Sequence, residues 1–181
     1  MKKKLSEKRQ IFWNNNLNEH EKQILIRAGF RVPEHFLVMP IVALIYFEGF
    51  GYECTIDLLC ALIEYLELPG DGFEDFMEEK WAFVKSFQEK EEYDDEFDEE
   101  LEWLFTLDEI FFVLGYTDVM KKSQITVQEL LNIEGISEYI VEDIMYEIFI
   151  AYNQTYKTPH HKFTTREDYM QNSKMLFEKL K

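Results

Sequence analysis

The chain has 181 residues, of which 46% are hydrophobic, 16% aromatic and 30% charged, and its formal charge is −17. This length and apolar content suffice for one sizeable core, or for two small cores that share an interface, and they argue against a largely disordered chain. Because the N-terminus lacks the apolar segment of a signal peptide, and the uncharged run 36–47 is too short to span a bilayer, we expect a cytoplasmic protein.

The charge is distributed unevenly along the chain. Residues 1–31 carry a net charge of +5 and residues 157–181 a net charge of +3, whereas the interval between them carries −25. Self-repulsion in such a region destabilises the compact state, a cost that is tolerated more easily if the charge has a use. Acidity that serves only solubility is the alternative explanation.

The first predicted elements lie in residues 1–31. Residues 1–16 are predicted to form a polar lead-in with a short aromatic patch at residues 11–13. Asn18 and Glu21 form a capping pair at the start of a helix, and Gly29 is expected to end that helix.

Two apolar helices are predicted next. One begins near Pro33 or after Pro40 and includes residues 41–47, which are apolar on nearly every side. This pattern predicts the central buried helix of the fold. Thr55 is predicted to cap the second, which covers residues 56–66. Its two cysteines, at positions 54 and 60, have poor spacing for a disulfide, so we expect buried free thiols.

Residues 74–109 are the most acidic part of the chain. They contain 16 of the 36 acidic residues and three lysines, a local net charge of −13. Asp71 and Glu74 predict the start of a helix that continues to about residue 90. Apolar residues recur at helical spacing through this stretch: Phe73, Met77, Trp81, Val84 and Phe87, then Tyr93, Phe97, Leu101, Leu104 and Phe105. An apolar stripe within such dense charge predicts a folded surface with a negative exposed face.

Further helices are predicted toward the C-terminus. Their capping residues and ranges are Thr106 with Glu109 before 107–114, Thr126 with Glu129 before 127–133, Ser137 before 138–149, and Thr164 or Thr165 before a last helix. No strand of alternating polarity is found. The sequence therefore predicts an all-α protein, a compact bundle of about eight helices with an acidic helical arm or face. Its expected parts are residues 1–70, 71–105 and 106–181, packed as one globular unit.

Residues 125–149 combine a short capped helix, a turn at Gly135 and a second helix, and they resemble a helix-hairpin-helix unit. The segment is similar to the unit in the C-terminal domain of the RNA polymerase α subunit. In DNA-binding members of this class, the turn usually carries two glycines, and hairpin amides and basic residues bind a phosphate. Here Glu134 lies on the turn. The carboxylates that follow are Glu138, Glu142 and Asp143. Because these charges would repel a phosphate, we interpret the segment as a structural hairpin.

The sequence contains no recognisable catalytic or metal-binding pattern. No glycine lies between Gly72 and Gly115, although a calcium loop needs a central one. The histidines and cysteines lack the spacing of a zinc site: His20, His35, His160, His161, Cys54 and Cys60. No nucleophile elbow, phosphate-binding loop or metalloprotease motif is present. We therefore predict no cofactor, no metal and no enzymatic activity.

The acidic stretch matches the charge density of a nucleic acid. If residues 89–102 were helical, their ten carboxylates would extend over about 21 Å, a length over which duplex DNA carries about 12 charges. The chain is similar in this respect to the acidic nucleic-acid mimics that phages and mobile elements direct at restriction or CRISPR nucleases. The resemblance implies an inhibitor of the anti-restriction or anti-CRISPR kind, whose partner is a basic nucleic-acid-handling protein such as a nuclease.

The predicted partner-binding residues are Glu89, Glu91, Glu92, Tyr93, Asp94, Asp95, Glu96, Asp98, Glu99, Glu100, Glu102 and Trp103. Tyr93 and Trp103, together with Phe97, are candidate aromatic anchors if they are exposed, while core packing is the alternative for each. Three other functions remain open. They are an immunity protein that neutralises a nuclease toxin, a nucleic-acid-binding or transcription-associated module that uses the hairpin, and a structural adaptor. Contact with a membrane is not expected, and direct binding of nucleic acid is disfavoured.

Overall fold

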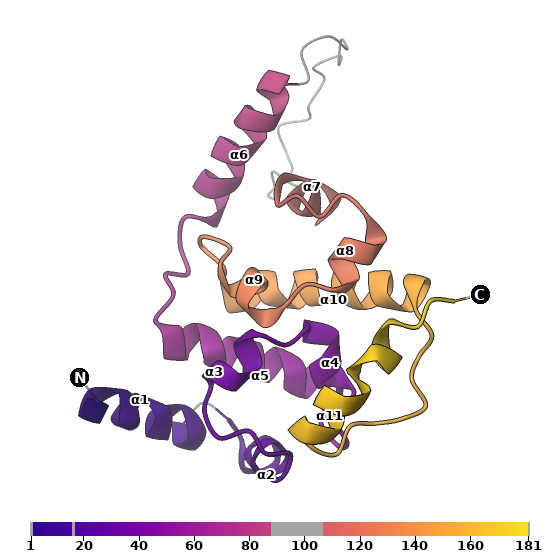
Figure 1. Ribbon diagram of the computed structural model, residues 1–181. Coiled ribbons are helices and arrows are strands. Elements are labelled where there is room, and N and C mark those ends of the chain that lie inside the picture. The colour runs from indigo at the N-terminus through magenta and orange to yellow at the C-terminus, as the bar shows by residue number, and fades with distance from the viewer. Residues whose placement is uncertain (1, 16, 88–106, 181) are drawn as a thin grey trace.

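The computed structural model describes residues 2–15, 17–87 and 107–180 (Figure 1). Within these ranges the chain forms eleven α-helices and one 3₁₀-helix, so the all-α prediction is confirmed. Isolated β-bridges, among them one between Phe47 and Phe163, are the only extended pairings in the described ranges. The helix number exceeds the predicted eight because several helices have only four or five residues, too few to show a period in the sequence.

The helices are α1 (Lys2–Asn15), α2 (Glu19–Arg27), α3 (Glu34–Leu37), α4 (Ile41–Ile45), α5 (Gly51–Leu66), α6 (Phe73–Phe87), α7 (Leu107–Val113), α8 (Val119–Ser123), α9 (Val127–Leu131), α10 (Glu138–Thr155) and α11 (Arg166–Asn172), followed by the 3₁₀-helix η1 (Ser173–Phe177). Every helix in the described part of the chain is too short or too polar to cross a bilayer.

The N-terminal segment is a helix, and the prediction of a polar lead-in was wrong. Helix α1 buries Phe12, whose ring lies 5.2 Å from that of Trp13 and 5.5 Å from that of Tyr65. Arg9 also contacts Glu34 with an N–O distance of 3.0 Å. The sequence of α1 is rich in lysine and contains few apolar residues at helical spacing, so it does not show the pattern that identifies a helix. Contacts with the rest of the protein stabilise such a helix.

The capping box of α2 is confirmed, because Glu21 N–H donates to Asn18 Oδ1 and Asn18 N–H donates to Glu21 Oε2, both at 3.0 Å. The expected role of Thr55 was wrong. Helix α5 begins four residues earlier, at Gly51, and the Thr55 hydroxyl donates to the Gly51 carbonyl at 2.7 Å inside the helix. A threonine in the interior of a helix can satisfy its hydroxyl in this way, and its identity alone does not distinguish it from a cap.

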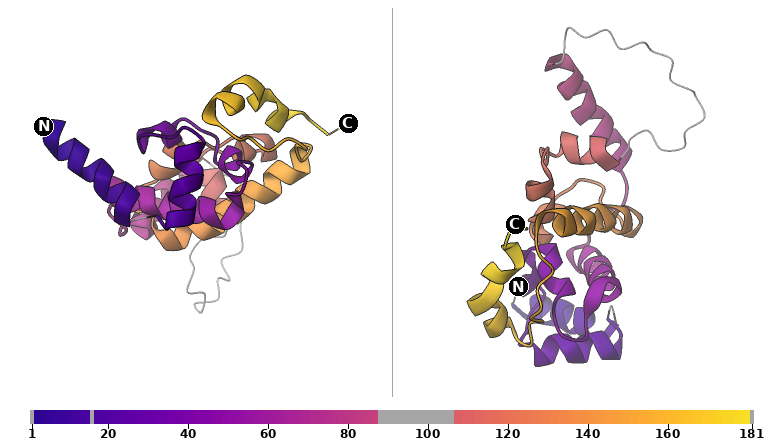
Figure 2. Two further views of the ribbon diagram at one scale, coloured as in Figure 1. Left: turned by 90° about the horizontal axis from the view of Figure 1, so that it is seen from below. Right: turned by 90° about the vertical axis from the view of Figure 1, so that its right-hand side faces the viewer.

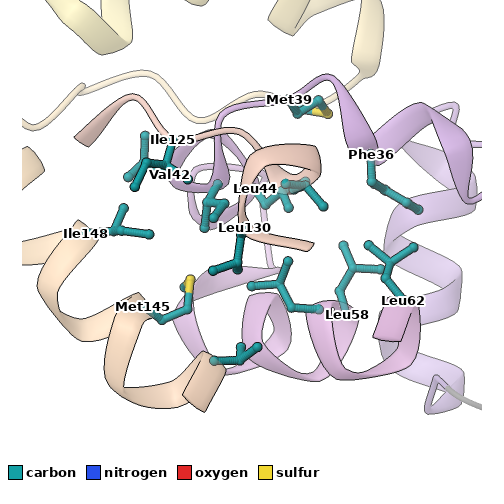
Figure 3. Packing of buried hydrophobic residues seen from close by; sticks show 14 of the residues in the cluster. Phe36, Met39, Val42, Leu44, Leu58, Leu62, Ile125, Leu130, Met145 and Ile148 are labelled. Carbon is teal, nitrogen blue, oxygen red and sulfur yellow. The ribbon is translucent and has the colours of Figure 1, made fainter. Parts of the chain in front are cut away.

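Helix α4 is the buried centre of the fold, as predicted, since all five of its residues are buried. It packs against α5 and α10 (Figure 3). Figure 3 shows the side chains that meet there: Val42 and Leu44 from α4, Leu58 and Leu62 from α5, Leu130 from α9, and Met145 and Ile148 from α10. Residues far apart in the sequence therefore share one core.

Helix α6 extends away from this core, as Figure 1 and the right-hand view of Figure 2 show. It packs against α7, and the rings of Trp81 and Phe112 lie 6.4 Å apart between the two helices. At the opposite side of the molecule, Phe163 anchors the C-terminal segment. Its N–H donates to the Tyr46 carbonyl at 2.8 Å, and its carbonyl accepts from Glu48 N–H at 2.9 Å.

Candidate functional site

The residues predicted to bind a partner lie outside the described residues. These are Glu89, Glu91, Glu92, Tyr93, Asp94, Asp95, Glu96, Asp98, Glu99, Glu100, Glu102 and Trp103, and Phe97 lies outside as well. The structure describes the helices that precede and follow these residues in the sequence. Helix α6 ends at Phe87, α7 begins at Leu107, and the two helices pack together.

The described part of α6 has the amphipathic character that the sequence predicts. Phe73 and Met77 are buried, while the side of the helix that carries Glu74, Asp75, Glu78 and Glu79 is exposed. Within the described ranges, none of these four carboxylates forms an ion pair with a lysine or arginine. Lys8 and Arg9 of α1 instead pair with Glu67 and Glu34. The exposed side of α6 therefore carries four negative charges next to one another in the sequence.

The start of α6 covers the helical hairpin. Helices α9 and α10 flank Gly135, which is buried and has a φ of +70°. A Cβ at this position would lie 2.2 Å from Phe73 N and 2.6 Å from Phe73 Cα. The backbone at the start of α6 thus covers the Gly135 side of the turn. A ligand cannot approach the turn from that side.

An acidic cleft of about 330 Å³ lies where α2, α5 and α10 meet. Its lining includes four acidic residues and a thiol: Glu21, Asp57, Glu64, Glu138 and Cys60. The acidic residues come from three segments that are distant in sequence, and only the fold brings them together. Sequence reasoning missed this site, since each carboxylate taken alone resembles an ordinary surface residue.

Glu21 is the buried carboxyl of this cleft, with only 2% of its surface exposed. Burial, followed by a hydrogen bond with the Asp57 carboxyl, raises its pKa above the usual value, although bonds from Asn18 oppose this. The nearby Asp57 carboxyl favours the protonated form of Glu21, because two negative charges at this distance would repel each other.

Stability should depend on pH through Glu21. The folded chain holds the Glu21 proton more tightly than the unfolded chain, so the free energy of unfolding falls as pH rises from the usual carboxyl range through the raised pKa. Glu21→Gln keeps a residue that can complete the capping box, and it removes the carboxyl whose ionisation lowers the free energy of unfolding. We expect its Tm, relative to the unmodified protein, to rise as pH increases from about 4 to about 8.

Exposed Glu74→Gln is the matched control for this measurement, because it removes one negative charge from α6 without touching the cleft. Parallel changes of Tm with pH in both variants would show that net charge, and not the buried pair, governs the effect.

The two cysteines are free and partly buried. Burial, and then the charges of Glu138 and Asp57, raise the pKa of the Cys60 thiol to about 11. Burial and the charge of Glu21 also raise the pKa of Cys54. Both thiols therefore stay protonated at neutral pH, a state in which they are poor nucleophiles.

The remaining candidate ligands are dispersed. His161 pairs with Asp168 at 3.0 Å, where Asp168 also accepts the Thr164 N–H at 2.9 Å. Among the residues that the structure describes, no group of three His, Cys, Asp or Glu side chains is arranged to hold a metal ion.

The described residues form an all-α fold, and the whole chain carries a net charge of −17. Comparison with protein families, curated proteins and solved structures gives no significant match.

Proposed function

We propose that the protein is an acidic inhibitor that binds the basic nucleic-acid-binding site of a nuclease or of another protein that handles DNA or RNA. The observation that carries this proposal is the net charge of −13 over residues 74–109, where apolar residues recur at helical spacing. In α6 that spacing coincides with a buried side and an exposed acidic side. Fixed carboxylates at this density can pair with lysines and arginines that are arranged for phosphates.

The packing of α6 against α7 supports the proposal. Residues 88–106 connect two helices that contact each other, through Trp81 and Phe112 among others. Helix α6, which carries the exposed carboxylates Glu74, Asp75, Glu78 and Glu79, extends outward from the core, as the right-hand view of Figure 2 shows. An outward-directed acidic element can enter a cleft that the body of the protein could not enter.

The hairpin offers little support for the alternative of a nucleic-acid-binding module. Gly135 faces the Phe73 backbone, and the exposed residues Glu134, Glu138 and Glu142 surround the hairpin with negative charge. Inhibition of a nuclease toxin by an immunity protein would use the same electrostatics with a different partner.

The proposal predicts capture of basic, nucleic-acid-binding proteins from a host lysate by the purified full-length chain. Duplex DNA added to the captured complexes should displace the partner, because both ligands compete for one site. Replacing four carboxylates by amides (Asp94, Asp95, Glu99 and Glu100) should weaken binding at least about fourfold, since each exposed ion pair contributes roughly 0.2–1 kcal/mol. Raising the salt concentration should weaken binding further.

A matched variant controls for total charge. It carries amides at four exposed carboxylates on other surfaces, Glu7, Glu48, Glu167 and Glu178. Equal losses in the two variants, or partners that duplex DNA does not displace, would rule out a nucleic-acid mimic centred on residues 89–102.

A further inference from the structure

A second acidic surface lies on the body of the protein, on helices α5 and α10. The two helices pack antiparallel. Tyr52, at the start of α5, lies against Phe149, near the end of α10, with ring centroids 5.6 Å apart. At the other end, Cys60 of α5 and Glu138 of α10 line the same cleft. Their outward sides therefore form one continuous strip of surface.

This strip contains no positive charge of its own. Helix α5 has three acidic residues and α10 has four, and neither helix contains a lysine or an arginine. Within the described ranges, no basic side chain pairs with Glu53, Asp57, Glu142 or Asp143. Burial, followed by the charges of Glu53 and Glu142, raises the pKa of the Tyr52 phenol, which is consistent with a negative local potential.

Two tyrosines stand out from the strip. Tyr139 is 73% exposed and Tyr146 is 58% exposed, although aromatic side chains of this size are usually buried. They are seven residues apart on α10, two helical turns, so they lie on one side of the helix. Glu142 and Asp143 are exposed between them. Exposed aromatics beside unpaired charge are typical of protein interfaces, where tyrosine concentrates binding energy.

The acidic cleft lies at the Glu138 end of this strip. Asp57 gives it acceptor oxygens on one wall, and Glu138 lies on the first turn of α10. A guanidinium group suits such a cleft, because its planar fork donates to carboxylates and its face stacks on tyrosine rings. A metal ion suits it less, since no three of the described ligand side chains converge on one point.

We propose that the α5–α10 surface, defined by Glu53, Asp57, Glu138, Tyr139, Glu142 and Tyr146, binds an arginine-rich segment of a partner protein. Charge complementarity selects the basic occupant, and the tyrosines together with the carboxylate-lined cleft select arginine over lysine. This binding does not require residues 89–102, so the surface is a second contact and not part of the proposed inhibitory element.

The test uses a full-length variant in which amides replace all ten carboxylates in residues 89–102, because those charges would compete for a basic peptide. This variant is titrated into fluorescein-labelled nona-arginine at about physiological salt. Fluorescence anisotropy gives the Kd. Binding is expected, and nona-lysine should bind at least about fivefold more weakly, since lysine lacks the planar fork.

Two variants of that chain locate the peptide. Tyr139→Ser with Tyr146→Ser should weaken nona-arginine binding about tenfold, as expected for aromatic hot spots. Glu142→Gln with Asp143→Asn should weaken it about fivefold. The matched control, Glu74→Gln with Asp75→Asn, removes the same charge from α6 and should weaken binding less than about twofold. Peptide-induced NMR shifts should concentrate on α10, and this readout needs no substitution on α10 itself.

Three results would overturn the proposal: no binding of nona-arginine, equal affinity for the two peptides with the tyrosine variant unchanged, or equal losses in the α10 and α6 charge variants. None of these results bears on the inhibitor proposal, because the titrated chain lacks the charges on which that proposal depends. Conversely, peptide binding at α10 would stand even if partner capture by residues 89–102 failed.

Discussion

Gly135→Ala should destabilise the protein by about 2–5 kcal/mol. Two costs add at this position. The residue has a φ of +70°, a left-handed conformation that costs a residue with a Cβ about 1–2 kcal/mol. The added methyl would also lie 2.2 Å from Phe73 N, a backbone atom that cannot move aside without shifting the start of α6, and such overpacking costs typically 1–3 kcal/mol. Urea unfolding followed by far-UV circular dichroism measures the sum.

Gly115→Ala separates the two costs. Gly115 has a similar φ of +83°, but an added Cβ there would meet nothing within 4 Å. We therefore expect Gly115→Ala to lower the free energy of unfolding only by the cost of the left-handed conformation, about 1–2 kcal/mol. If both alanine variants lose the same free energy of unfolding, the contact between the hairpin and α6 has no energetic weight.

Phe36→Ala should cost about 3–5 kcal/mol, the range for removing a buried phenylalanine. Phe36 is completely buried and stacks on Phe30 with ring centroids 4.5 Å apart. Its ring also lies 6.5 Å from that of Phe12 and 6.4 Å from that of Trp13, so it links α1 to the core. The denaturant midpoint should fall strongly, and the fluorescence contributed by Trp13 should change.

Val38→Ala is the control for this substitution, because Val38 lies two residues away in sequence and is 74% exposed. Its expected effect is within about 0.5 kcal/mol. A loss of less than about 1 kcal/mol in Phe36→Ala would contradict a single core that includes α1.

Local rules in the sequence predicted the parts of this fold that depend on neighbouring residues. The capping boxes at Asn18 and Thr126 form as expected, because their hydrogen bonds involve residues only three positions apart. The buried nature of α4 was also predictable, since a run without charged residues must avoid water. The all-α class followed from these helix signals together.

Features that depend on tertiary contact escaped prediction. Helix α1 is held by contacts with Glu34 and Tyr65, which the local sequence cannot reveal. The cleft requires Glu21, Asp57 and Glu138 to converge from three helices. The exposure of Tyr139 and Tyr146 likewise depends on which side of α10 faces the core. Their spacing by seven could have pointed to one shared face, but not to its outward direction.

The exposed side of α6 has a consequence for how this protein can evolve. Exposed residues of α6 such as Glu74 and Glu78 lie outside the buried core around α4, α5 and α10. Under the proposed inhibitory function, selection by a changing target can therefore alter these residues while the helical body keeps its packing.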